Sequence, residues 1–92
     1  MIIQQDKRFC REFEKLSTVD QARIRDALKK IVSVFGEPHR HAGLGLRKLG
    51  RDVYEVRVGL ELRILMTRHK AVLLLRTIGN HDEISRFLRD LL

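Results

Sequence analysis

The sequence predicts an α+β fold in which a short strand and two helices precede four strands and a last helix. Up to about residue 35, apolar residues recur every three or four positions, which is the period of a helix. Between residues 53 and 67 apolar and polar residues alternate, which is the period of a strand. Successive strands joined by short turns favour antiparallel pairing. We therefore expect the order β-α-α-β-β-β-β-α, with a small antiparallel sheet covered on one face by the helix hairpin.

The first third of the chain is predicted to hold a strand over Ile2–Gln5 and then the helix hairpin. Asp6 can cap the first helix, because its carboxylate can accept from free backbone N–H groups. Ser17 and Thr18 offer the cap of the second helix, with Gln21 at capping-box spacing from Thr18. The apolar stripes of the two helices are Phe9, Phe13 and Leu16 in the first and Ile24, Leu28, Ile31 and Phe35 in the second.

Glycine and proline separate the helix hairpin from the sheet. The Gly-Glu-Pro at residues 36–38 is expected to end the second helix. A glycine-rich loop over residues 39–50 contains a short strand at Leu46–Leu49. Asn80 can cap the last helix, with Glu83 three residues further on. The other expected strands are Val53–Val58, Glu61–Thr67 and Val72–Leu75, and the last helix presents an apolar stripe of Ile84, Phe87, Leu88 and Leu91.

The register of the central hairpin follows from its alternation. Opposed residues in an antiparallel pair share a face, so a three-residue turn after Val58 sets Arg57 opposite Arg63. A slip by one residue would place apolar side chains opposite charged ones. Two opposed arginines on the face away from the helices are unfavourable unless they hold an anion, and the guanidinium fork suits phosphate. The alternative is that Glu55 or Glu61 neutralises the pair.

Histidines offer the main candidates for chemistry. His81 follows the last strand at a helix N-terminus, where backbone N–H groups favour anions, and an imidazole exchanges protons near neutral pH. The alternative is that His81 is a plain helix cap. His39 and His41 form a His-x-His pair that could bind a metal, but no third ligand is evident and a solvated loop is favoured. We expect no metal and no other cofactor.

The composition predicts a basic protein of a reducing compartment. The 92 residues carry 19 Lys and Arg against 12 Asp and Glu, a formal charge of +7. This excess favours a polyanionic partner, above all nucleic acid, although basic residues can also simply keep a small domain soluble. Arg47, Lys48 and Arg51 could contact phosphates or form a solvated rim. The single cysteine, Cys10, fits the cytoplasm, and no apolar run approaches the ~20 residues that span a membrane.

Three stretches carry a family resemblance. They are LRKLGRDVYEVRV at 46–58, LELRILM at 60–66 and IGNHDEISRFLRDL at 78–91. With the order of elements, they make the chain similar to the RelE/ParE superfamily of bacterial toxins, and specifically to its RelE-type mRNA interferases. The resemblance covers nearly the whole chain and implies a single RelE-like domain over residues 1–92 with a curved sheet.

The resemblance also implies an activity. It implies that Arg57 and Arg63 hold and stabilise a phosphate, that His81 is the general acid and that Glu55 is a weaker candidate base. The implied reaction is ribosome-dependent, metal-independent cleavage of mRNA in the cytoplasm, and the implied regulator is a cognate antitoxin. Many active relatives carry a tyrosine near the C-terminus, where this chain has Phe87 on an apolar stripe.

Two other functions stay open. A toxin of the ParE type would bind gyrase without catalysis, and a basic module could bind nucleic acid without chemistry. His81 together with the arginine pair favours the nuclease. A binding module would be expected to expose aromatic side chains for base stacking, whereas all four phenylalanines lie on apolar stripes.

Overall fold

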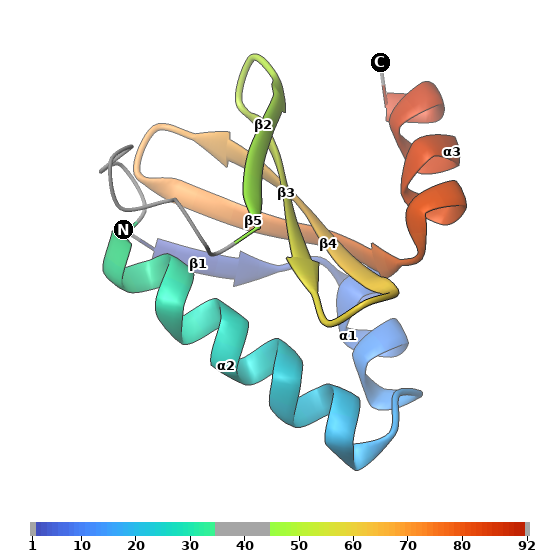
Figure 1. Ribbon diagram of the computed structural model, residues 1–92. Coiled ribbons are helices and arrows are strands. Elements are labelled where there is room, and N and C mark those ends of the chain that lie inside the picture. Colours follow the sequence, from blue (N-terminus) through green and yellow to red (C-terminus); the bar gives the residue numbers. More distant parts are fainter. Residues whose placement is uncertain (1, 35–44, 92) are drawn as a thin grey trace.

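The computed structural model describes residues 2–34 and 45–91. The elements follow the predicted order, and the predicted helix end at residues 36–38 lies outside the described residues. They are β1 (Ile2–Gln5), α1 (Lys7–Glu14), α2 (Thr18–Val34), β2 (Leu46–Gly50), β3 (Val53–Val58), β4 (Leu62–His69), β5 (Val72–Gly79) and α3 (His81–Leu91), as labelled in Figure 1.

The strands form one mixed sheet in the order β1-β5-β4-β3-β2. The four strands from β2 to β5 each pair antiparallel with the next, as predicted. β1 instead pairs in parallel with β5, with Ile2 opposite Val72. The expectation of a wholly antiparallel sheet is therefore wrong for this strand. Short turns impose antiparallel pairing, whereas β1 and β5 are joined only through the rest of the fold.

The helix hairpin covers one face of the sheet through the main core. Ile24 and Ile31 of α2 and Phe9 of α1 are almost completely buried there. As predicted, the sheet contributes its alternating apolar residues, namely Val56, Val58, Ile64 and Met66, with Tyr54 and Leu62 half-buried beside them. Burial of such side chains is the main source of stability of the fold.

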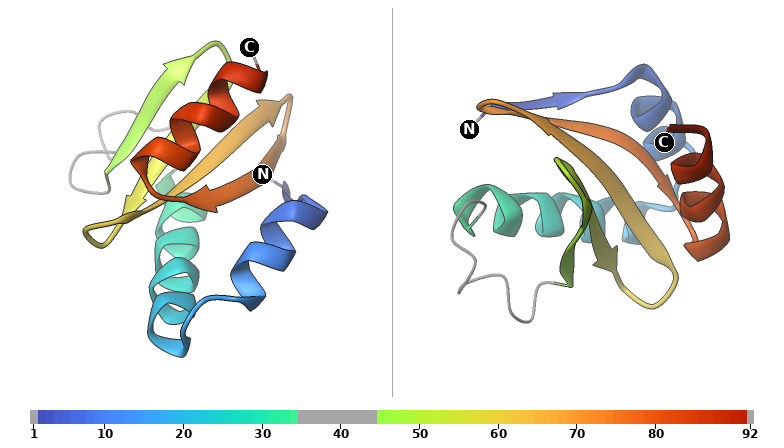
Figure 2. Two further views of the ribbon diagram at one scale, coloured as in Figure 1. Left: turned by 90° about the vertical axis from the view of Figure 1, so that its right-hand side faces the viewer. Right: turned by 90° about the horizontal axis from the view of Figure 1, so that it is seen from above.

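A second, smaller core attaches α3 to the opposite face. Ile84 of α3 is buried against Val53 of β3 and Leu65 of β4, with Leu49, Phe87, Leu88 and Leu91 packed around them. The helices α2 and α3 thus lie on opposite sides of the sheet (Figure 2). Because this core takes up only part of the face, the end of β3 and the start of β4 stay outside it.

The helix starts differ in detail from the predicted caps. Asp6 stands at the N-cap of α1, but its carboxylate makes no capping bond and lies 3.3 Å from Arg76 Nε. Ser17, and not Thr18, caps α2, because Ser17 Oγ accepts from the backbone N–H of Asp20 at 3.1 Å.

No helix of the described residues is long and apolar enough to cross a membrane.

Candidate active site

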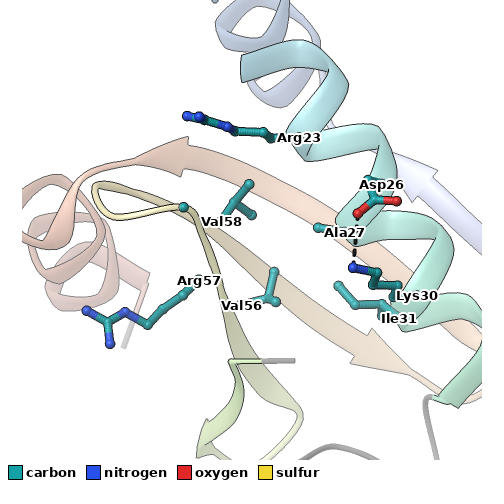
Figure 3. A pocket seen from close by; sticks show the side chains of 9 residues that line it. Arg23, Asp26, Ala27, Lys30, Ile31, Val56, Arg57 and Val58 are labelled. Atoms are coloured by element: carbon teal, nitrogen blue, oxygen red, sulfur yellow. Dashed lines mark ion pairs between the residues drawn. The ribbon is translucent and has the colours of Figure 1, made fainter. Parts of the chain in front are cut away.

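The two arginines of the central hairpin lie directly opposite each other. Arg57 of β3 is the register partner of Arg63 of β4, and Val58 is the partner of Leu62, which confirms the predicted register. The Arg57 side chain is exposed, and its guanidinium points away from α2, whereas Val56 and Val58 point toward that helix (Figure 3). The arginine pair therefore belongs to the face opposite the helix hairpin.

Glu55 neutralises one member of this pair. Its side chain is only 5% exposed, and Glu55 Oε1 lies 3.2 Å from Arg63 Nη1. Arg47 of β2 is the register partner of Glu55 and approaches the same oxygen to 3.7 Å. Arg57 makes no ion pair with any residue of the described ranges. The alternative that a neighbouring glutamate neutralises the arginine pair therefore holds for Arg63 and not for Arg57.

His81 contacts the same nitrogen of the Arg63 guanidinium. Arg63 Nη1 lies 3.0 Å from His81 Nδ1. A guanidinium has only donors, so a hydrogen bond between these two nitrogens has to be accepted by Nδ1, in the tautomer that carries its proton on Nε2. The structure thus joins Glu55, Arg63 and His81 into one chain of contacts, with Arg57 facing Arg63 across the strands.

The start of α3 fixes where His81 lies. Asn80 Oδ1 accepts from the backbone N–H of Glu83 at 2.9 Å, and Glu83 Oε1 accepts from the backbone N–H of Asn80 at 2.9 Å. This reciprocal pair is the predicted capping box. Gly79 precedes it as the register partner of Arg63. A Cβ atom at Gly79 would come within 2.8 Å of Glu83 Cβ, so only glycine lets the helix begin this close to β5.

Gly45 plays a similar part beside Arg57. Its φ angle is +71°, which suits glycine, and its carbonyl accepts from the backbone N–H of Arg57 at 3.2 Å. A Cβ atom at Gly45 would lie 3.1 Å from Arg57 Cβ. Sequence reasoning missed the roles of Gly45 and Gly79. The signal was there in the glycine-rich loop and in the glycine that ends the last strand.

Two shallow hollows meet at Arg63. One, of about 340 Å³, is lined by Gly45, Leu46, Arg47, Glu55, Arg57 and Arg63. The other, of about 350 Å³, is lined by Leu60, Glu61, Arg63, Asn80, His81 and Asp82. Arg63 lines both, so an anion bound beside it would have Arg57 on one side and His81 on the other.

The three basic residues suggested for RNA contacts do not lie together. Arg47 joins the site through Glu55. Lys48 is the register partner of Tyr54, which places it on the α2 side of the sheet. Arg51 lies exposed in the turn between β2 and β3, at the opposite end of β3 from Arg57. Only Arg47 of this set is placed to contact a ligand of the arginine pair.

The remaining candidates lie elsewhere. Tyr54 packs against the main core, as predicted. Phe87 packs in the second core, and the guanidinium carbons of Arg8 and Arg76 lie 4.9 and 5.8 Å from its ring centre. His39 and His41 lie outside the described residues. Within residues 2–34 and 45–91, no group of three or more His, Cys, Asp and Glu side chains is arranged to hold a metal ion.

Comparison with known proteins gives matches only among solved structures, because no family model and no curated protein sequence matches the chain. A chain of the RelB–RelE antitoxin–toxin complex from Methanococcus jannaschii superimposes with a TM-score of 0.70 at 15% identity, over 91% of this chain and 96% of that one. A mutant of the Escherichia coli toxin RelE in the free state gives 0.67 at 18% identity, over 99% and 97%. The intact Escherichia coli RelBE complex gives 0.62 at 20% identity, over 86% and 94%.

These likenesses extend over nearly the full length of both partners in each comparison. The chain therefore has the fold of RelE toxins, in agreement with the resemblance of its sequence to the RelE/ParE superfamily.

Proposed function

We propose that the chain is the toxin of a type II toxin–antitoxin system and that it cuts mRNA on the ribosome without a metal ion. The RelE toxin fold supports the toxin role. The contact between Arg63 and His81 carries the proposal of catalysis, because it sets a cation and a proton-transfer group side by side. A cognate antitoxin, mRNA and the ribosome are the partners of this function, which is exercised in the cytoplasm.

The reaction that suits these groups is an internal transfer within RNA. The ribose 2′-oxygen attacks the adjacent phosphorus, so the O2′–P bond forms while the P–O5′ bond breaks. The extra negative charge on the phosphorus oxygens needs nearby cations, and the departing O5′ needs a proton. Arg57 and Arg63 provide the cations, His81 provides the proton to O5′, and the proton of the 2′-hydroxyl passes to water.

Glu55 is the less suitable candidate for the base. Its carboxylate is almost completely buried, and its Oε1 is engaged by Arg63 and Arg47. A base has to reach the 2′-hydroxyl with a lone pair that is not already occupied. We therefore assign Glu55 a positioning role on Arg63 in place of the proton acceptor that the family resemblance implies.

We also propose that basic residues bind RNA phosphates next to the one that reacts. Arg47 lines the same hollow as Arg57, so it can hold a phosphate next to the one at Arg57. Lys48 and Arg51 would add charge without sharing that hollow, so their effect should be on salt-dependent affinity and not on the cleavage step.

The test is to express the chain with and without the small reading frame next to its gene and to map mRNA 5′ ends. We expect cuts inside translated codons that appear only without the neighbouring protein and that disappear in His81→Ala and Arg63→Ala. His69→Ala is the matched control, because His69 is exposed at the opposite end of β4. Growth arrest with intact mRNA and damaged DNA would refute the nuclease and indicate a gyrase inhibitor.

A further inference from the structure

One nitrogen of Arg63 serves two acceptors of different charge. Nη1 lies 3.2 Å from the Glu55 carboxylate and 3.0 Å from His81 Nδ1. Nη1 carries two hydrogens, so it can donate one to each acceptor. While it does so, the lone pair of Nδ1 is occupied, and the ring cannot take up the second proton that would make it an imidazolium.

This arrangement conflicts with a general acid at rest. An imidazole gives up a proton far more readily as the imidazolium, which needs a proton on both ring nitrogens. In the structure, a cation stands at Nδ1, where that second proton would have to be added. The contact with Arg63 must therefore be given up before Nδ1 can carry a proton and His81 can act as the acid for O5′.

We propose that an RNA phosphate controls the protonation of His81 by competing for Arg63. When the phosphate takes the hydrogen bond that His81 now accepts, Nδ1 is released and takes up a proton from solvent. The imidazolium can then deliver its Nε2 proton to the leaving O5′. The inference rests on the proposed function for the identity of the phosphate, but the control of His81 by Arg63 is a property of the free protein.

The relative strength of the three acceptors decides which contact is lost. A guanidinium bound to a phosphate or carboxylate oxygen gains the attraction of two opposite charges and can form two parallel hydrogen bonds, whereas its bond to a neutral imidazole joins a charge to a dipole only. Glu55 is charged and almost completely buried, so it keeps its bond to Arg63. The neutral His81 ring is exposed and is the acceptor that a phosphate displaces.

The surroundings favour both the arrival of the phosphate and the change at His81. Arg57 faces Arg63, is exposed and has no ion-pair partner within residues 2–34 and 45–91, so it draws an anion to this place. The groups that share the hollow of His81 are Leu60, Glu61, Arg63, Asn80 and Asp82. Glu61 and Asp82 also bring two carboxylates into this hollow, and their charge would lie near a ring that carries a proton on both nitrogens.

The experiment follows the ring nitrogens of His81 by ¹⁵N NMR in the folded chain. Free protein is expected to show Nδ1 unprotonated and the proton on Nε2. Addition of a DNA oligonucleotide, which lacks the 2′-hydroxyl and cannot be cut by this reaction, should protonate Nδ1 at the same pH. The ring of His69 serves as the internal control and should not change, because His69 lies at the far end of β4.

Two variants separate the steps. Arg63→Met removes the donor, so the His81 ring should lose its fixed form and show both neutral tautomers in the free protein. Arg57→Met should leave the His81 ring of the free protein unchanged. It should raise the oligonucleotide concentration needed to protonate Nδ1 by at least tenfold. Inorganic phosphate at high concentration is the second probe, because it needs no RNA-binding surface.

The outcomes distinguish this inference from the proposed function. An oligonucleotide that binds without altering the His81 ring, or an Arg63→Met ring identical to that of the parent, would overturn the inference. If inorganic phosphate changes the ring and the oligonucleotide does not bind, the control by Arg63 stands, and binding of nucleic acid by the free chain is refuted.

Discussion

Glu12 of α1 binds the end of β5 at Thr77. The two Glu12 carboxylate oxygens lie 2.8 and 2.9 Å from Thr77 Oγ1, and Oε1 also accepts from the backbone N–H of Ile78 at 2.9 Å. Thr77 and Ile78 are both buried. One carboxylate of the first helix thus satisfies two buried donors just before the strand reaches the candidate site.

Replacing Glu12 by alanine should therefore destabilise the fold. The variant leaves a buried hydroxyl and a buried N–H without their acceptor, and each such group costs about 1–3 kcal/mol. Urea unfolding followed by circular dichroism would measure the loss. Glu14→Ala on the exposed side of the same helix is the control and should change the free energy of unfolding by less than about 0.5 kcal/mol. Equal effects of the two variants would contradict the role of Glu12.

A methyl group at Gly79 should disturb both stability and the candidate site. The added Cβ would lie 2.8 Å from Glu83 Cβ, so the first turn of α3 must move away from β5. Such overpacking costs about 1–3 kcal/mol. His81 lies in that turn, so RNA cleavage should fall as well. Gly50→Ala is a matched control, because nothing lies within 4 Å of a Cβ there. A Gly79→Ala protein as stable as Gly50→Ala would show that the close approach has no energetic importance.

Replacing Arg63 by lysine tests whether the shape of the guanidinium matters. Lysine keeps the charge, but its ammonium group cannot bind a carboxylate and a phosphate in the planar geometry of the fork. Loss of one contact to the developing charge costs on the order of 10²–10³ in rate. We expect Arg63→Lys to lose most of that factor in cleavage of mRNA on programmed ribosomes. Arg11→Lys, at an exposed position of α1, should cleave at the parent rate. Full activity of Arg63→Lys would show that the site needs a positive charge at this position but not the planar guanidinium.

Neutralising Glu55 tests its positioning role. Glu55→Gln keeps an acceptor for Arg63 and removes the negative charge that holds the guanidinium beside Arg57. Misplacement of a catalytic group by about 1 Å can cost on the order of 10² in rate. We expect kcat to fall by up to about this factor of 10². KM should stay nearly constant, because Glu55 is buried and does not touch the substrate. An unchanged kcat, or a rise in KM alone, would argue against this role. Glu14→Gln is the control.

The alternation of apolar and polar residues in the sequence is sufficient to predict the pairing of the two central strands. Alternation of apolar residues together with a three-residue turn allows only one favourable register, and this places Arg57 opposite Arg63. The capping box at Asn80 and Glu83 was also predictable, because it depends on residues three positions apart. Both features depend on neighbours in sequence, which periodicity can detect.

Features that depend on distant segments were not predictable. β1 has four residues, and nothing in its sequence indicates that it lies parallel to β5. The apolar stripe of α3 predicts that it packs, but not that it packs on Val53 and Leu65. The contact of Arg63 with His81 depends on the rotamer of the long Arg63 side chain. Glu55 of the neighbouring strand β3 fixes that rotamer.

The parallel pairing of β1 with β5 has a consequence for synthesis of the chain. Residues 2–5 find their partners only at residues 72–75, so the sheet gains its outer strand only after the residues between them have been made. His81 follows still later, and pairings this remote in sequence form slowly. The outer strand and the residues of the candidate site are therefore among the last parts of the fold to come together, after the hairpin of β3 and β4 that carries Arg57 and Arg63.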